Sequence, residues 1–249
     1  YEDEGYYRVG LELVSNLSQR RKNELQFITD FLPANDGQRT LVDVGSGDGG
    51  YLKIAEEMGY RASGVDTSAA SVRMSQAQGL DVFQGSLKAR NYDSRSVDLV
   101  TFFTTLEHFI DPKSELKEAF RILKPGGSVY ITRVPNLDSA MGEAQRERFY
   151  DIKTGHYYYF STETIKRLLE SLGFEVEMVE TKIRGDLLEL EHRNQRISDS
   201  DYERIKSNIE DLERKGKGEK LTVIARKPAL SNLIRPIEEE LIEFRRKVL

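Results

Sequence analysis

One stretch of the sequence decides the fold: Leu41-Val42-Asp43-Val44-Gly45-Ser46-Gly47-Asp48-Gly49-Gly50. A strand-like run passes directly into a glycine-rich turn, and a helical pattern opens at about Tyr51. Glycine lets the backbone of such a turn come close to a ligand, and the N-terminus of the helix offers unpaired N–H groups and the positive end of a dipole. The stretch therefore predicts a cofactor-binding loop in an α/β domain, with a purely structural strand–helix turn as the alternative.

The kind of cofactor is not decided by the glycines. Gly45, Gly47 and Gly50 satisfy G-x-G-x-x-G, the dinucleotide fingerprint, so a nicotinamide cofactor stays open at this point. Asp66 ends the second predicted strand, where a carboxylate can accept both hydroxyls of an adenosine ribose, and that role fits either cofactor. Asp43 separates the two hypotheses, because nicotinamide folds usually carry a small or apolar residue there. A buried acid at this position can order the loop and favour the cationic end of a sulfonium amino acid.

Strand-like and helical segments alternate from residue 41 to about residue 181, which indicates βαβ units and a parallel sheet. Asp111 and Pro112 form an N-cap and first-turn pair, and Ser161 can cap a further helix that Gly173 ends. The predicted strands are Thr40–Val44, Ala62–Val65, Val82–Phe83, Val97–Phe103, Ser128–Thr132, Phe174–Val179 and Leu221–Ala225.

The chain divides into three regions by the character of its residues. Residues 1–33 are predicted to be an N-terminal helical segment, residues 34–228 the α/β domain, and residues 229–249 a C-terminal helix. Residues 184–219 are a charged insertion before the last strand, with a capping-box pattern at Ser200 and Glu203. The apolar stripes of the insertion and of the C-terminal helix would cover the parent domain or bind a partner helix. The stripe of the insertion comprises Tyr202, Ile205, Ile209 and Leu212.

The composition of the 249 residues is that of an ordinary soluble globular protein, with 38% hydrophobic and 32% charged residues. A net charge of −5 argues weakly against nucleic acid or an anionic membrane as a partner. The absence of cysteine excludes disulfides, thiolate metal sites and cysteine nucleophiles. No apolar run approaches the ~20 residues of a membrane span, and the acidic start does not resemble a signal peptide. A cytoplasmic protein is expected.

Four linked motifs carry a resemblance to a known family. They are D-V-G-S-G-D-G from Asp43, G-V-D-T-S from Gly64, V-D-L-V-T-F-F-T-T-L-E-H from Val97 and L-K-P-G-G-S-V-Y-I-T from Leu123. In order and spacing they resemble class I S-adenosylmethionine-dependent methyltransferases over residues 40–181. The later segments 155–161 and 172–174 resemble the branch of ubiquinone-biosynthesis O-methyltransferases and of sugar or natural-product methyltransferases. The resemblance implies a Rossmann-like sheet of six parallel strands, with a last, antiparallel strand between the fifth and sixth.

The resemblance also implies S-adenosylmethionine as cofactor and assigns residues to it by position. Gly45, Ser46 and Gly47 would face the methionine portion, and Asp66 would hold the ribose. Family members commonly carry an aspartate at the adenine amine after the third strand, where this sequence has Ser86. The full set of expected cofactor residues is Asp43, Gly45, Ser46, Gly47, Asp66, Thr67, Ser86, Leu87, Phe103 and Thr104.

Methyl transfer is an in-line displacement at carbon, so the enzyme mainly aligns the acceptor and excludes water. A base is needed only where the acceptor must lose a proton. His108 follows the fourth strand at the carboxyl edge of the sheet, and His156 lies in the loop before the Ser161 helix. Both are candidates for catalysis, with structural hydrogen bonding as the alternative. His192 lies in the charged insertion and is expected to be a surface residue.

Some relatives hold a metal with Glu-x-x-Glu-His. Thr104 stands at the first glutamate of that pattern here, so Glu107 and His108 alone leave an incomplete site, and no metal is predicted.

Further residues are candidates for contacts with the acceptor or for covering the site. Glu107 lies beside His108, and Arg133 follows the fifth strand, where its guanidinium could grip a carboxylate or phosphate. Tyr157 could wall a pocket for an aromatic or sugar acceptor, although packing would give the same pattern. Tyr7 begins a segment that the resemblance places as a lid over the cofactor.

These observations support methyl transfer from S-adenosylmethionine to a small-molecule acceptor, O- or N-directed, with sugar, nucleotide-sugar or quinone-like acceptors preferred. One alternative is an enzyme that methylates RNA or tRNA. Another is a non-catalytic S-adenosylmethionine-binding protein that assembles, also as a homo-oligomer, through residues 184–249. The RNA hypothesis needs a basic face, to which Arg146, Arg148, Arg184, Arg193 and Arg196 could contribute, although acidic residues lie among them.

Overall fold

The computed structural model describes residues 18–35 and 37–229. The predicted lid position of Tyr7 and the predicted C-terminal helix lie outside the described residues. Within the described ranges, no helix is both long and apolar enough to cross a membrane.

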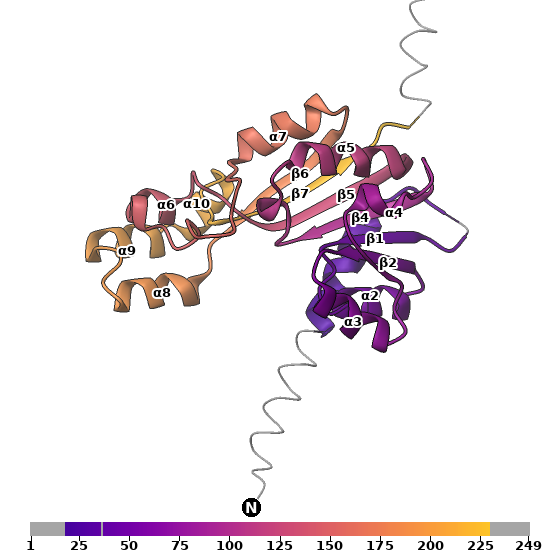
Figure 1. Cartoon of the computed structure of the whole chain (residues 1–249). Coiled ribbons are helices and arrows are strands. Elements are labelled where there is room, and N and C mark those ends of the chain that lie inside the picture. Colours follow the sequence, from indigo (N-terminus) through magenta and orange to yellow (C-terminus); the bar gives the residue numbers. More distant parts are fainter. Residues whose placement is uncertain (1–17, 36, 230–249) are drawn as a thin grey trace, which may run out of the picture.

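A seven-stranded sheet in the order β3-β2-β1-β4-β5-β7-β6 forms the centre of the molecule (Figure 1). β7 is antiparallel to both of its neighbours, β5 and β6, and the other pairs are parallel. The predicted Rossmann-like sheet, with its last strand antiparallel between the fifth and sixth, is therefore confirmed. The strands are β1 (Thr40–Val44), β2 (Arg61–Asp66), β3 (Val82–Gln84), β4 (Val97–Phe103), β5 (Leu123–Pro135), β6 (Glu175–Lys182) and β7 (Lys220–Arg226).

Helices cover both faces of the sheet because its strands are apolar on both sides. On one face, the helix of residues 18–30, α2 (Gly50–Glu57) and α3 (Ala69–Ala77) pack on residues such as Leu41 and Leu99. On the other, α4 (Leu87–Arg90), α5 (Pro112–Ile122) and α7 (Thr162–Ser171) pack on residues such as Val42 and Val100. Neighbouring residues of one strand thus belong to different cores, as the period of two requires.

The predicted helix starts at Asp111 and Ser161 are confirmed. The Asp111 carboxylate accepts the backbone N–H of Ser114, and Ser161 forms a capping box with Thr164. The capping box predicted at Ser200 and Glu203 is wrong. Ser198 is the N-cap instead, because its hydroxyl accepts the backbone N–H of Asp201.

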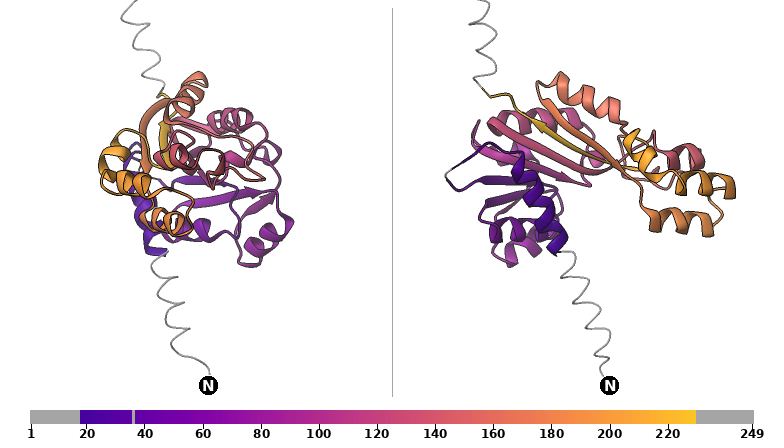
Figure 2. Two further views of the ribbon diagram at one scale, coloured as in Figure 1. Left: turned by 90° about the vertical axis from the view of Figure 1, so that its left-hand side faces the viewer. Right: turned by 180° about the vertical axis from the view of Figure 1, so that it is seen from behind.

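The charged insertion forms a group of short helices with α6, and we call this group the helical lobe. It consists of α6 (Ala140–Gln145), α8 (Gly185–Arg193), α9 (Asp199–Lys206) and α10 (Ile209–Arg214), with the 3₁₀ turn η2 (Arg146–Arg148). The lobe lies beyond the end of the sheet, to which β5 and β6 lead (Figures 1 and 2). Ile205 and Tyr202 pack there on Leu188, Met141 and Phe149. Tyr202 and Ile205 of the predicted stripe are therefore buried within the chain, against other helices rather than the sheet, whereas Ile209 and Leu212 are half-buried.

Candidate cofactor and acceptor site

The loop between β1 and α2 is bound tightly to the end of β2. The backbone N–H groups of Gly45 and Ser46 both donate to the carbonyl oxygen of Val65, at 2.8 and 3.2 Å. Gly47 N–H donates to Oδ2 of Asp66 at 2.9 Å, and Ser68 N–H donates to Oδ1 at 2.8 Å. A carboxylate offers about four lone-pair positions, so Asp66 can hold the loop and still accept hydroxyl groups from a ligand.

Gly45 is required by its conformation and by its surroundings. Its φ is 75°, and a Cβ atom built there would lie 2.5 Å from Cγ2 of Thr105. Any side chain would therefore push the loop away from the residues that follow β4.

Two adjoining pockets open beside this loop and share Gly45 and Thr104. The first has a volume of about 330 Å³ and the second about 270 Å³. The first is lined by Asp66, Thr67, Ser86, Leu87 and His108, among others. The second is lined by Asp43, Ser46, Gly47, Phe103, Arg21 and Arg133, among others. The structure thus brings all of the predicted cofactor residues together around these two adjoining pockets.

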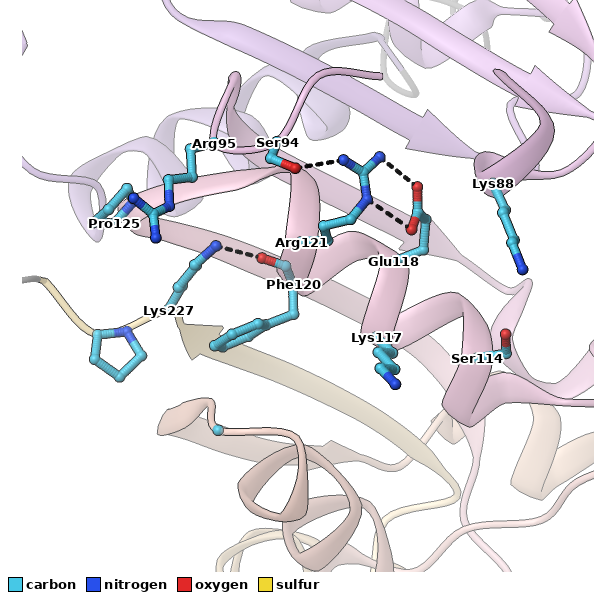
Figure 3. Close-up of a pocket in the computed structure, with 12 residues that line it drawn as sticks. Lys88, Ser94, Arg95, Ser114, Lys117, Glu118, Phe120, Arg121, Pro125 and Lys227 are labelled. Atoms are coloured by element: carbon cyan, nitrogen blue, oxygen red, sulfur yellow. Dashed lines mark hydrogen bonds and ion pairs between the residues drawn. The ribbon is translucent and has the colours of Figure 1, made fainter. Parts of the chain in front are cut away.

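A larger cavity of about 980 Å³ lies elsewhere, between α5, the start of β5 and the end of β7 (Figure 3). Its basic side chains include Arg121, which donates to Glu118 and Ser94, and Lys227, which donates to the carbonyl oxygens of Phe120 and Leu123. It contains none of the predicted site residues. It also lies at the amino ends of the parallel strands, whereas folds of this kind bind ligands at the carboxyl ends.

Asp43 is buried beneath the second pocket. Its Oδ1 accepts the Thr101 hydroxyl at 2.7 Å. Burial raises the pKa of Asp43 to about 7, although the Thr101 hydrogen bond and the nearby charge of Arg21 favour its ionised form. A ligand cation in this pocket would favour ionisation further.

Arg21 was not predicted from the sequence. It belongs to the helix of residues 18–30, yet its guanidinium reaches the start of α2, where a Cβ atom built on Gly50 would lie 2.7 Å from Nη1. A guanidinium suits a carboxylate ligand. No sequence signal indicated that this helix face meets the glycine loop.

Arg133 lines the second pocket and not the first, which His108 lines. Its guanidinium pairs with Oε2 of Glu24 at 3.0 Å and lies 5.7 Å from the ring centroid of Phe103. Glu24 also accepts the Tyr130 hydroxyl at 2.7 Å. Arg133 thus lines the pocket of Asp43, Ser46 and Gly47, and its grip on an acceptor stays a prediction.

Thr104 stands where the two pockets meet. Its φ is 51°, an unusual value for a β-branched residue, and its N–H donates to the Thr132 carbonyl at 3.0 Å. Strained backbone of this kind often marks functional sites.

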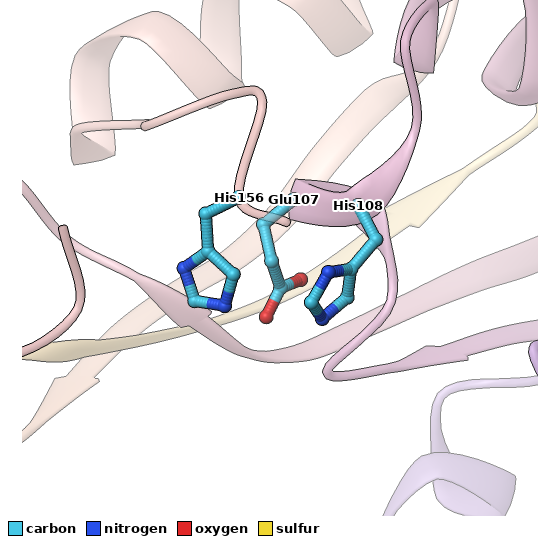
Figure 4. A group of neighbouring side chains, drawn as sticks. All are labelled: Glu107, His108 and His156. Carbon is cyan, nitrogen blue, oxygen red and sulfur yellow. The ribbon is translucent and has the colours of Figure 1, made fainter. Parts of the chain in front are cut away.

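Glu107, His108 and His156 form a compact cluster beside the first pocket (Figure 4). Glu107 and His108 lie on the 3₁₀ turn η1 (Leu106–His108) that follows β4, and His156 comes from the loop before α7. One potential ligand atom from each lies within 4.8 Å of the others. The loop is fixed by the Tyr157 N–H, which donates to the Glu107 carbonyl at 2.8 Å.

The electrostatics of this cluster are unusual. The Glu107 side chain is 0% exposed, and neither carboxylate oxygen has a hydrogen-bond partner among the described residues. Burial raises the pKa of Glu107 and lowers the pKa of His156. Both shifts favour the uncharged forms of these two side chains, although the charges of His108 and Lys220 favour the ionised form of Glu107.

Large apolar side chains are exposed on the loops around the cluster. Tyr157 is 61% exposed and Ile110 is 77% exposed, and Tyr158 and Ile152 are exposed as well. Tyr157 therefore does not serve to fill the core, and it is free to contact a ligand.

Comparisons with known proteins agree with this geometry. A family described as a methyltransferase domain matches residues 17–179. A protein of Mycolicibacterium smegmatis named a probable S-adenosylmethionine-dependent methyltransferase is 30% identical over 142 residues, which are 56% of this chain and 53% of that protein. A ubiquinone biosynthesis O-methyltransferase of Cupriavidus pinatubonensis is 28% identical over 105 residues, which are 39% of this chain and 41% of that protein. The matched region spans about half the length of these relatives.

Solved structures share the fold. A methyltransferase from Archaeoglobus fulgidus has a TM-score of 0.60 and 23% identity, covering 89% of this chain and 100% of that one. Geranyl diphosphate C-methyltransferase from Streptomyces coelicolor, in complex with Mg²⁺, geranyl diphosphate and S-adenosylhomocysteine, has a TM-score of 0.59 and 19% identity, covering 86% and 82%.

The order of the sheet and the glycine loop beside Asp66 define the class of Rossmann-like S-adenosylmethionine-binding proteins. This chain belongs to the methyltransferase domain family, and the cofactor of these enzymes is S-adenosylmethionine.

Proposed function

We propose that this protein transfers the methyl group of S-adenosylmethionine to a small-molecule acceptor bound beside Glu107, His108 and His156. The proposal rests mainly on the observation that the cofactor pocket reaches the cluster. One pocket is lined both by Asp66, the expected ribose ligand, and by His108, a member of the cluster. An acceptor at the cluster would therefore lie next to the cofactor.

The two pockets suit the two halves of the cofactor. The adenosine would occupy the first pocket, with its ribose hydroxyls on Asp66 and its base beside Ser86 and Leu87. The methionine portion would occupy the second, with its carboxylate on Arg21 and its ammonium group near Asp43. The sulfonium would then lie where the pockets meet, at Thr104.

Bound S-adenosylmethionine supplies an electrophilic methyl group, and the acceptor's lone pair displaces a neutral thioether from it. The residues of the chain align the acceptor and manage its proton. A hydroxyl acceptor would pass its proton to an imidazole, and His156 is suited to receive it because burial lowers its pKa and keeps it neutral.

The acceptor class follows from the surface around the cluster. The exposed Tyr157, Tyr158 and Ile110 would contact an aromatic or otherwise apolar ring, and a hydroxyl on that ring could reach the cluster. This favours an O-directed enzyme with a quinone-like or phenolic acceptor over one that acts on a sugar. The name of the relative from Cupriavidus pinatubonensis is consistent with this choice.

The RNA alternative has less support. Three arginines of its expected basic face pair with acids, namely Arg184 with Asp186, Arg193 with Glu189 and Arg196 with Glu191. These pairs reduce the positive potential available to phosphates.

The test is a turnover assay that measures S-adenosylhomocysteine with a panel of catechols, phenols, sugars, nucleotide-sugars and tRNA. Turnover is expected with dihydroxylated aromatic compounds and is expected to fall at least 100-fold in His156→Gln. The matched control is His192→Gln, which changes a histidine that stacks on Tyr202 in the lobe. Turnover with tRNA alone, lost at high salt, would contradict the proposal.

A further inference from the structure

Two imidazoles flank the Glu107 carboxylate (Figure 4). A carboxylate that is fully buried without hydrogen-bond partners is costly, because the energy of desolvation is not returned by any interaction. The charge of Lys220 favours the ionised carboxylate, but its ammonium group is already held by both oxygens of Asp151, at 3.0 and 2.8 Å. A cation bound at the cluster would offset the cost of burying this carboxylate.

His108 is oriented by a neighbouring backbone group. Its Nδ1 lies 2.7 Å from the carbonyl oxygen of Gly155, which can only accept a hydrogen bond. The proton is thus assigned to Nδ1, and Nε2 keeps its lone pair. This is the arrangement that metal-bound histidines nearly always have, in which the second ring nitrogen donates to a carbonyl or carboxylate.

We infer that Glu107, His108 and His156 bind a divalent transition-metal ion such as Zn²⁺. Two imidazoles and one carboxylate form a ligand set that zinc and non-haem iron enzymes use, and it leaves coordination positions for a substrate. Ligand atoms about 2.1 Å from a tetrahedral ion lie about 3.4 Å apart. The ligand atoms now lie within 4.8 Å of one another, so side-chain rotations that move them by about 1 Å would bring them to this separation.

The threonine at position 104 does not rule out a metal site at this cluster. It occupies the position at which some relatives carry another glutamate, but His156 supplies the third ligand from a different segment. The expectation that Glu107 and His108 stand alone is therefore corrected by the path of the loop before α7.

The metal would change how the cluster acts in the reaction, and this part of the inference rests on the proposed function. His108 lines the cofactor pocket, so an ion held by this cluster would lie beside the space expected for the acceptor. An acceptor hydroxyl bound there would lose its proton more readily, because the ion lowers the pKa of a coordinated oxygen. The imidazoles would then serve as ligands, and the proton would leave to solvent.

The test is metal binding by the whole chain, without any acceptor. Protein stripped with a chelator is titrated with Zn²⁺ by calorimetry and with Co²⁺ by visible absorption. We expect one ion per chain and the intense absorption of a low-coordinate Co²⁺ site. Glu107→Gln and His156→Gln should each weaken binding at least tenfold, whereas His192→Gln should bind like the wild type. Circular dichroism and cofactor titration show that each variant is folded.

Two results would overturn the inference: no saturable binding of either ion, or binding that both cluster variants leave unchanged. Titration of the same samples with S-adenosylmethionine separates this inference from the proposed function. Cofactor binding without metal binding would reject the metal site alone. Metal binding without cofactor binding would keep the metal site and reject the proposed methyl transfer.

Discussion

The backbone N–H of Gly47 donates to the carboxylate of Asp66 across 2.9 Å. This contact joins the loops that follow the first two strands of the sheet, and a second N–H, from Ser68, holds the other carboxylate oxygen. Asp66 is thus both a fixed part of the loop structure and the expected ligand of the ribose.

Arg21→Gln is expected to weaken binding of S-adenosylmethionine by roughly 10- to 100-fold, because a charged hydrogen bond to the ligand's carboxylate contributes about 1.5–3 kcal/mol. Calorimetric titration measures the change. The matched control is Arg20→Gln, since Arg20 is the adjacent residue and is exposed. Equal affinity of the two variants for S-adenosylmethionine would show that Arg21 does not bind the ligand.

The buried Asp43 predicts a specific pH dependence of stability. Its pKa is raised from 3.8 to about 7 in the folded protein, so the folded state holds a proton that the unfolded state releases. Stability should therefore fall as the pH rises from about 4 to about 7, by an amount on the order of 2–4 kcal/mol. Asp43→Asn should remove this part of the dependence. Urea unfolding of both proteins at pH 5 and pH 8 is the check, and parallel behaviour of the two would contradict the assignment.

Ser198→Ala should destabilise the lobe by about 1 kcal/mol, because the Ser198 hydroxyl caps α9. Ser200→Ala should cost only about a few tenths of this amount, because Ser200 lies inside the helix. Denaturant unfolding followed by circular dichroism compares the two. The reverse order would support the capping box predicted from the sequence.

Ile205→Ala should cost about 2–5 kcal/mol, because Ile205 is fully buried among the lobe helices. Leu190→Ala, at a 47% exposed position on α8, should change stability by less than about 0.5 kcal/mol. Hydrogen exchange is expected to show faster opening of the lobe in Ile205→Ala, with the strands of the sheet still protected. Uniform loss of protection across the chain would show that lobe and sheet unfold together.

The sequence was sufficient to predict the order and direction of the strands in the sheet. β1 and β4 begin and end at the predicted residues, because each is an apolar run bounded by turn signals. β5 is longer than predicted. It was predicted to begin at Ser128 but begins at Leu123, where Gly126 at φ 83° lets the strand continue through an irregularity.

The sequence was not sufficient to predict which side chains meet when they come from segments far apart in the chain. His156 joins Glu107 and His108 only because the loop before α7 is bound to the Glu107 carbonyl. The insertion is broken between α9 and α10 at Ser207 and Asn208, whose side chains bond to nearby carbonyls instead of continuing the helix. The helical spacing of Tyr202, Ile205, Ile209 and Leu212 predicts a single helix, because spacing does not report such local competition.

Calorimetric titration with S-adenosylmethionine and S-adenosylhomocysteine tests the central claim most directly, with wild-type protein beside Asp66→Ala. The control is Asp81→Ala, which removes an exposed carboxylate that pairs with Arg90. The account predicts that the wild type and the control bind both compounds at one site per chain, and that Asp66→Ala binds them roughly 10- to 100-fold more weakly. Folded wild-type protein that binds neither compound, or equal binding by Asp66→Ala, would contradict the account.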